Sequence, residues 1–104
     1  MTEEAKLRIR VLLAVQVSLL GTVGPNLRAV TCSWSRSDIR VRAIFDLTIG
    51  NIDAECMSDV ETEIMSHFPE HEVTVSCVQI KAPSMLNITS GEVFVFKRRE
   101  HSFS

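Results

Sequence analysis

The clearest pattern along the chain is an apolar repeat of four residues in its second half. Apolar side chains recur at every fourth position from Ile52 to Phe68. Side chains four residues apart lie on one face of a helix. The repeat therefore predicts a helix over residues 52–67, capped by Asn51 and ended by Pro69, which restrains the residue before it and lacks a backbone donor. The stripe consists of Ile52, Cys56, Val60, Ile64 and Phe68, with Met57 and Met65 alongside.

A second helix is predicted over residues 3–20. Thr2 can cap its start and Gly21 can end it. The alternation in Leu7–Val11 is also compatible with a strand, but the length of the apolar run favours a helix. We expect this helix to be largely buried, because its apolar face is broad. That face comprises Leu12, Val15, Leu19 and Leu20, with Ala5, Leu7 or Val11 beside them.

Four further segments have the composition and alternation of strands. In the second of them, apolar Ile39, Val41 and Ala43 alternate with Arg40 and Arg42, so one face fits a core and the other is basic. The order helix, strand, strand, helix, strand, strand predicts an α+β fold with two layers. We expect two helices packed on one face of a four-stranded antiparallel sheet. The strands are expected at residues 27–34, 39–47, 72–80 and 92–98.

Two features concern the organisation of the chain. Arg28–Cys32 and Val73–Cys77 have similar chemistry, which suggests a duplicated helix–hairpin unit. The link over residues 81–91 is long for a hairpin, so it is a candidate for a functional or disordered segment. With 104 residues we expect one domain, with a loose tail over residues 99–104.

Composition points to a reducing, cytoplasmic environment. The cysteines number three and lack metal-binding spacing, so we read them as small buried hydrophobic residues. Basic residues precede an apolar run near the N-terminus, as in a signal peptide. However, Glu3 and Glu4 interrupt the basic part, Gln16 and Ser18 interrupt the apolar part, and the run is too short to span a bilayer.

Charge is distributed unevenly along the chain. The formal net charge is only −2, but the segment from Asp46 to Glu72 contains eight carboxylates and no Lys or Arg, which leaves five acids and all eleven bases elsewhere. Such a charge distribution gives information about binding partners and not about the fold.

The predicted second helix concentrates this negative charge. Glu55, Asp59 and Glu63 follow one another at four-residue steps, and Thr62 and Ser66 complete the polar side. Like charges at this spacing cost roughly 0.2–0.5 kcal/mol per pair. Two interpretations are open: the five residues bind a basic partner, or Arg40, Arg42 and the C-terminal bases neutralise the acids across the fold.

Other kinds of chemistry have weaker support. Arg28, Arg40 and Arg42, with Lys97–Arg99, form a basic strip that could meet phosphates, but the net charge is negative and aromatic content is only 6%. His67 and His71 have a metal-binding spacing that Pro69 interrupts. We therefore expect no metal, no cofactor and no nucleic-acid partner, and the absence of a catalytic motif predicts a protein that is not an enzyme.

Several short segments resemble a known protein group. Ala14–Gln16, Leu27–Val30, Phe45–Asp46, Val60–Ile64 and Phe68–Pro69 are similar to small bacterial immunity proteins of polymorphic and contact-dependent growth-inhibition toxin systems. The resemblance implies a cytoplasmic protein that binds a cognate toxin domain, often a basic nuclease.

The resemblance supplies no binding positions, so the residues expected to bind the toxin come from charge placement alone. They are Glu55, Asp59, Thr62, Glu63 and Ser66. A non-catalytic regulatory or adaptor domain that assembles through its sheet is the alternative. The sequence leaves the oligomeric state open.

Overall fold

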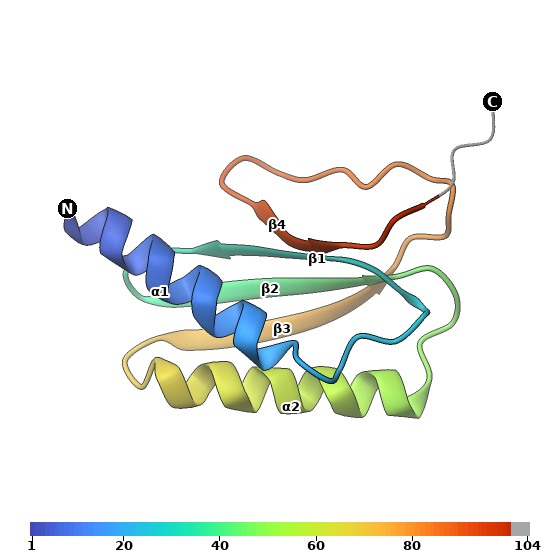
Figure 1. The fold of residues 1–104 in the computed structure, drawn as a ribbon, viewed down its shortest axis with the longest axis horizontal. Helices are drawn as coiled ribbons and strands as arrows, with labels where there is room; N and C mark the ends of the chain where they lie inside the picture. The colour runs from blue at the N-terminus through green and yellow to red at the C-terminus, as the bar shows by residue number, and fades with distance from the viewer. Residues whose placement is uncertain (101–104) are drawn as a thin grey trace.

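A computed structural model describes residues 1–100, in which two helices lie on one side of a four-stranded sheet (Figure 1). The α+β class and the predicted order of elements are confirmed. The elements are α1 (Glu3–Ser18), β1 (Leu27–Trp34), β2 (Asp38–Phe45), α2 (Asn51–His67), β3 (Glu72–Gln79) and β4 (Val93–Lys97).

Local signals explain where the helices begin and end. The Thr2 side chain accepts a hydrogen bond of 3.1 Å from the Ala5 backbone N–H, which is the expected cap of α1. Helix α1 ends at Ser18, two residues before the predicted end, and Gly21 follows with a positive φ of 80°. Helix α2 is capped by Gly50 rather than by Asn51, which is its first helical residue.

The sheet is mixed, so the prediction of a purely antiparallel sheet is wrong. Its strand order is β3-β2-β1-β4. Strands β1 and β2 form the expected antiparallel hairpin, but β2 and β3 run parallel. The reason is α2, which lies between these two strands in the sequence and carries the chain back along the sheet, so β3 starts at the same end as β2.

The second half of the chain does not repeat the first. Strand β4 pairs antiparallel with β1 at the edge of the sheet opposite β3. The last two strands are therefore not a hairpin, and the suggested duplicated helix–hairpin unit is wrong. The long link after β3 exists because the chain must pass from one edge of the sheet to the other.

The core lies between the two helices and one face of the sheet. It contains Val11 and Val15 from α1, Val60 and Ile64 from α2, and the inward-facing residues of the strands, all in one cluster. Ile39, Val41, Ala43 and Phe45 belong to it, so the predicted alternation of the second strand is confirmed.

The expectation that the first helix is largely buried is wrong. Only Val11, Ala14, Val15 and Ser18 of α1 are buried. Its opposite side is apolar as well and remains exposed, since a helix against a two-layer core buries only one face. In α2, Ile52 is 78% exposed although it begins the apolar stripe, because it lies in the first turn at the end of the layer.

The link between β3 and β4 is attached to the sheet by arginines that point away from the helices. Arg28 donates hydrogen bonds to the carbonyl oxygens of Ile80 and Ser84, at 2.8 and 3.0 Å. Arg42 donates to the Asn87 carbonyl at 2.9 Å. Part of the predicted loose tail, residues 101–104, lies outside the described residues, whereas Glu100 forms ion pairs with Arg28 and Arg98.

Candidate partner-binding surface

The five predicted binding residues all lie on the exposed side of α2. Glu55, Asp59, Thr62, Glu63 and Ser66 are exposed, and we call this set the acidic row. The buried residues Met57, Val60 and Ile64 occupy the other side of the helix and fix its rotation against the sheet. The apolar stripe read from the sequence therefore placed the acidic row correctly on the surface.

The two hydroxyl groups of the acidic row are oriented by their own helix. Thr62 Oγ1 donates to the Ser58 carbonyl at 3.1 Å, and Ser66 Oγ donates to the Glu63 carbonyl at 2.6 Å. Each hydroxyl thus uses its proton within the helix and leaves oxygen lone pairs facing outward. Both groups are therefore acceptors for an incoming donor, as the neighbouring carboxylates are.

Other acids of the same segment have structural roles. Glu61 accepts a hydrogen bond of 2.8 Å from the Val75 backbone N–H, a donor that β3 leaves unpaired at the sheet edge. Asp53 accepts from the Asn26 side chain, and Asp46 pairs with Arg98 at 2.8 Å. The structure thus separates carboxylates that hold the fold together from those of the acidic row.

Three of the bases that could have neutralised the acidic row, Arg40, Arg42 and Arg98, are paired with other acids. Arg40 lies 3.2 Å from Asp38, and Arg42 lies 2.9 Å from Glu92. Arg98 contacts Asp46 and Glu100 instead of α2. Within residues 1–100, no ion pair involves Glu55, Asp59 or Glu63.

A further arginine, Arg28, is buried on the side of the sheet away from the helices and is paired there. Arg28, only 2% exposed, makes two hydrogen bonds of 2.6 and 2.7 Å to the Glu100 carboxylate. Hydrogen bonding to Arg28 lowers the pKa of Glu100 below its ordinary value. For Glu92, burial raises the pKa, but hydrogen bonds from Thr31, the Thr89 N–H and Arg42 outweigh it, so the pKa is lowered overall.

This pairing also changes the predicted basic strip. Arg28 is buried and Arg42 is held by Glu92 and Asn87, so these two guanidinium groups serve the fold. Arg40 remains exposed, with a side chain 75% accessible. The strip is therefore not a continuous basic surface of the kind that binds phosphates.

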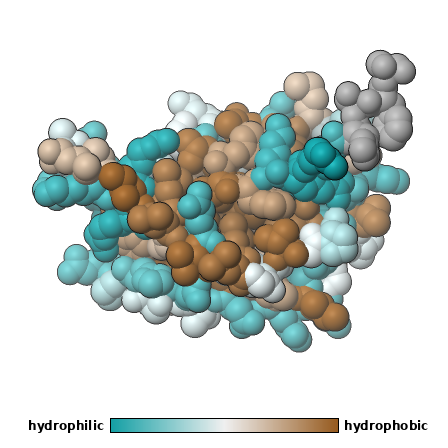
Figure 2. Space-filling model, viewed as in Figure 1, coloured by the Kyte–Doolittle hydropathy of each residue, from teal (hydrophilic) through white to brown (hydrophobic). Residues whose placement is uncertain are grey.

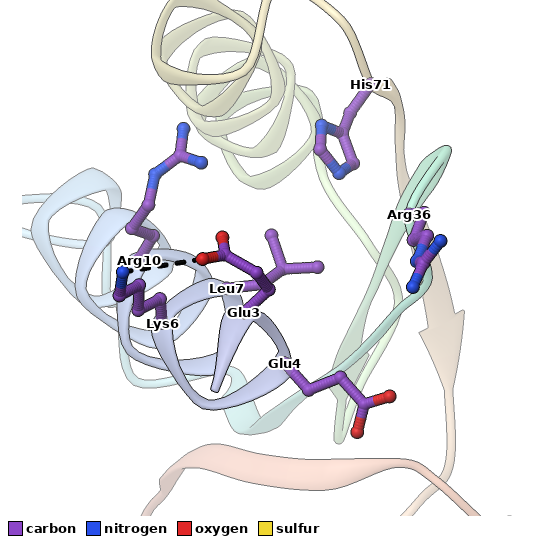
Figure 3. A pocket seen from close by; sticks show the side chains of 7 residues that line it. All are labelled: Glu3, Glu4, Lys6, Leu7, Arg10, Arg36 and His71. Atoms are coloured by element: carbon purple, nitrogen blue, oxygen red, sulfur yellow. Dashed lines mark hydrogen bonds and ion pairs between the residues drawn. The ribbon is translucent and has the colours of Figure 1, made fainter. Parts of the chain in front are cut away.

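The two histidines line different cavities. A cavity of about 510 Å³ is lined by His71, Arg36 and residues of the N-terminal part of α1, and Figure 3 shows these side chains around it. His67 lines a separate groove. No cluster of three or more His, Cys, Asp or Glu side chains that could hold a metal occurs among the described residues.

Cysteine chemistry adds no site. Among residues 1–100, Cys32, Cys56 and Cys77 are free thiols; Cys32 is buried, and the other two are half-buried. Burial raises the pKa of the Cys32 thiol to about 11, which keeps it protonated and unreactive.

The exposed side of α1 is the feature that sequence reasoning missed. The groove that contains His67 has a volume of about 290 Å³, and its other residues are Arg10, Leu13, Ala14, Val17 and Phe68. Arg10 lies over the Phe68 ring, with its guanidinium carbon 4.7 Å from the ring centre. The signal was present in the sequence, because the helix is apolar around most of its circumference.

Comparison with known proteins identifies the family. Residues 8–100 match the MafI2 immunity protein family. The chain belongs to this family. The sequence resemblance to immunity proteins of polymorphic toxin systems is thereby confirmed.

Other comparisons add little to the MafI2 assignment. No curated protein matches the chain. A chain in the solved structure of a tri-AMPylated Shewanella oneidensis HEPN toxin in complex with an MNT antitoxin shares 13% identity, with a TM-score of 0.48. The alignment covers 84% of this chain and 73% of that chain, and a likeness of this size carries no argument about function. No helix within residues 1–100 has the length and continuous apolarity needed to cross a membrane.

Proposed function

We propose that this member of the MafI2 immunity protein family neutralises a toxin by binding it directly, without catalysis, and that the acidic row contacts a basic surface of the toxin. The family supports the immunity role. The choice of contact surface rests on the pattern of ion pairs. Arg40, Arg42 and Arg98 pair with other carboxylates, while the acidic row has no ion pair within residues 1–100.

Energetics support a binding role for the row. Three like charges at successive four-residue steps destabilise the free helix by roughly 0.2–0.5 kcal/mol per neighbouring pair. No partner within residues 1–100 offsets this cost. A basic toxin surface offsets it in the complex, and the same charges accelerate the encounter between the two proteins.

A nuclease domain is the partner class that best fits this surface. Nucleases bind phosphates through Lys and Arg, so their substrate surfaces are basic. Carboxylates and outward-facing hydroxyl acceptors at α2 present the same kind of groups as a phosphate backbone does. We propose that the complex forms in the cytoplasm, where both chains would meet the nucleic acid that must be protected.

The adaptor alternative has less support. Assembly through the sheet could use either edge strand, β3 or β4. At the β3 edge, the Glu61 side chain already occupies the Val75 N–H. A covered edge donor protects a strand against further pairing.

The test uses a catalytically inactive form of a candidate toxin domain, taken from the reading frames next to this gene. Replacement of Glu55, Asp59 and Glu63 by Gln should slow association and reduce the dependence of the association rate on salt, because long-range attraction is lost. The matched control replaces Glu4, Glu70 and Glu72 by Gln. These three exposed acids lie outside the row, so the net charge changes equally in both variants.

Two results would contradict the proposal. If the wild-type protein does not bind or inhibit the toxin domain, direct neutralisation is wrong. If both triple variants slow association equally, net charge alone is responsible and the acidic row has no specific part.

A further inference from the structure

We infer that the toxin-binding surface extends from the acidic row onto α1, where an exposed apolar stripe contacts an apolar centre on the same basic toxin. This inference rests on the proposed function. The stripe is made of exposed residues of the α1 region and is distinct from the apolar repeat of α2. It consists of Ile9, Leu13, Val17 and Leu20.

The stripe is a continuous feature of one helix side. Its four residues follow at steps of four, four and three, so they lie along one face of α1 and the turn that follows it. They are 45, 56, 50 and 76% exposed, respectively. Figure 2 shows hydrophobic side chains gathered over the position of α1. Single exposed apolar residues scattered over a surface are normal, whereas a contiguous exposed apolar patch marks an interaction site.

The stripe and the acidic row face the same side of the molecule. Leu13 and Val17 line the groove between the helices together with His67 of α2. Glu63 lies one helical turn before His67, and Asp59 lies one turn before Glu63, so these two acids continue along α2 from the residue that lines the groove. A partner that covers the helical layer therefore meets apolar and acidic groups next to each other.

Interface size requires a second component besides the acidic row. From Glu55 to Ser66 the row spans eleven residue steps, or about 17 Å of helix, and one helix face is roughly 10 Å wide. That strip covers on the order of 170 Å², well below the roughly 800 Å² per partner of a stable interface. The apolar stripe adds a strip of similar length, and the groove joins the two.

Composition also fits the usual arrangement of an interface. Binding energy comes mainly from a buried apolar centre, whereas charged groups beside it set the orientation and the association rate. The stripe supplies the first component and the acidic row the second.

Charge selects the toxin rather than a second copy of this chain as the occupant. A basic toxin pairs opposite charges beside the apolar contact. In an interface between two copies, both would contribute the same acidic row. Each of the three bases of α1 already has a contact within its own chain, since Lys6 pairs with Glu3, Arg8 lies over Trp34 and Arg10 lies over Phe68.

The experiment compares two double variants, each of which replaces two exposed apolar side chains. Leu13→Gln with Val17→Gln changes the stripe. Leu47→Gln with Met85→Gln is the matched control, because Leu47 is 56% exposed, as Leu13 is, and Met85 is also exposed, but both lie in links between elements. Binding to the inactive toxin domain is measured at several salt concentrations, and the thermal stability of each variant confirms that it folds.

The stripe variant should bind the toxin about tenfold more weakly or worse, mainly through faster dissociation. Its salt dependence should equal that of the wild type, since no charge changes. The control variant should bind normally. This combination separates the stripe from the acidic row, whose variants change association and salt dependence instead.

Three results would overturn the inference, and they differ from one another. Normal toxin binding by a folded stripe variant shows that the toxin does not cover the stripe. Self-association of the free protein that the stripe variant abolishes, with toxin binding intact, assigns the stripe to a second copy. Failure of the wild type to bind the toxin rejects the proposed function itself and this inference with it.

Discussion

At the scale of single residues, packing distinguishes side chains that the sequence pattern treats alike. Ile52 and Val60 both belong to the four-residue repeat of α2, yet Ile52 is 78% exposed and Val60 only 1%. The repeat gives the direction in which a side chain points around the helix. It does not give how far the sheet extends beneath each turn, and that extent decides burial.

Val60→Asp should therefore destabilise the protein severely, by about 3 kcal/mol or more, because it places an unpaired charge in the core. Ile52→Asp should be tolerated, since the side chain stays in water and a carboxylate near a helix N-terminus is favourable. Thermal or denaturant unfolding of the two variants measures the difference. Equal stability of both variants would show that the register of α2 on the sheet is different.

Long-range polar contacts were beyond sequence reasoning. Arg28 was interpreted as part of an exposed basic strip, but it is buried and bonded to Glu100 and Ser84, which are 72 and 56 residues away. A charged residue in a strand is expected at the surface unless a partner is known. Here the partner comes from a segment that the sheet topology brings close.

At the scale of elements, α2 combines three roles that its sequence separates by helical position. Its apolar residues pack on the sheet, Glu61 occupies an edge donor of β3, and the acidic row faces solvent. The helical period predicted the first and third of these roles. It could not identify the role of Glu61, because the neighbouring strand and its pairing were not known.

Replacing Glu55, Asp59 and Glu63 by Gln should leave the free protein as stable as before or more stable, by at most about 1 kcal/mol, because like-charge repulsion is removed. Glu61→Gln should instead be destabilising, since the Val75 N–H loses an ionised acceptor. Denaturant midpoints of both variants test this contrast. A large loss of stability in the triple variant would mean that the acids support the fold after all.

Helix α1 shows the limit of amphipathic reasoning. Its sequence is apolar on nearly all sides, and such a helix is normally buried all round. In a two-layer fold only the sheet and α2 are available to cover it, so the face that carries Leu13 and Val17 stays exposed. The expectation of burial failed because the local sequence pattern does not show how many layers of secondary structure pack around a helix.

At the scale of the whole molecule, the sequence predicted the elements and their layers but not the sheet topology. The two hairpin-like pairs suggested an antiparallel sheet, whereas the order β3-β2-β1-β4 makes one pair parallel. Strand alternation reports which face a side chain takes and carries no information on the neighbouring strand. The connection through α2 fixes the parallel pair, and the β3–β4 link places the last strand at the opposite edge.

That last segment is fastened to the sheet by three carboxylates, and this arrangement predicts how the protein responds to acid. Asp46 pairs with Arg98, Glu92 with Arg42, and Glu100 with Arg28. The pKa of each carboxyl group is lowered below its ordinary value. Hydrogen bonds from the arginines are the largest cause for Asp46 and Glu100, whereas for Glu92 burial raises the pKa and several hydrogen bonds together outweigh it. In the unfolded chain the same groups titrate near their ordinary pKa, about 4.

The sign of the effect follows from linkage. Because the folded-state pKa values are lower than the unfolded ones, the stabilisation is fully present above about pH 5 and is lost as pH falls through the folded pKa values. We therefore expect the free energy of unfolding to decrease steeply below about pH 4. Residues 80–100 should lose amide hydrogen-exchange protection first, since all three ion pairs hold this segment.

Glu92→Gln tests the contribution of one of these ion pairs, Arg42–Glu92, to the acid response. The Glu92 side chain is only 9% exposed and also accepts a hydrogen bond from Thr31, so the variant should lose roughly 1–3 kcal/mol at neutral pH. Its stability should then fall less steeply on acidification, because one titrating group has been removed. Glu70→Gln, an exposed acid without an ion pair in the described residues, serves as the control and should follow the wild type. Chemical denaturation from pH 7 to pH 3 measures both properties, and a wild-type slope for Glu92→Gln would show that this ion pair does not control the acid response.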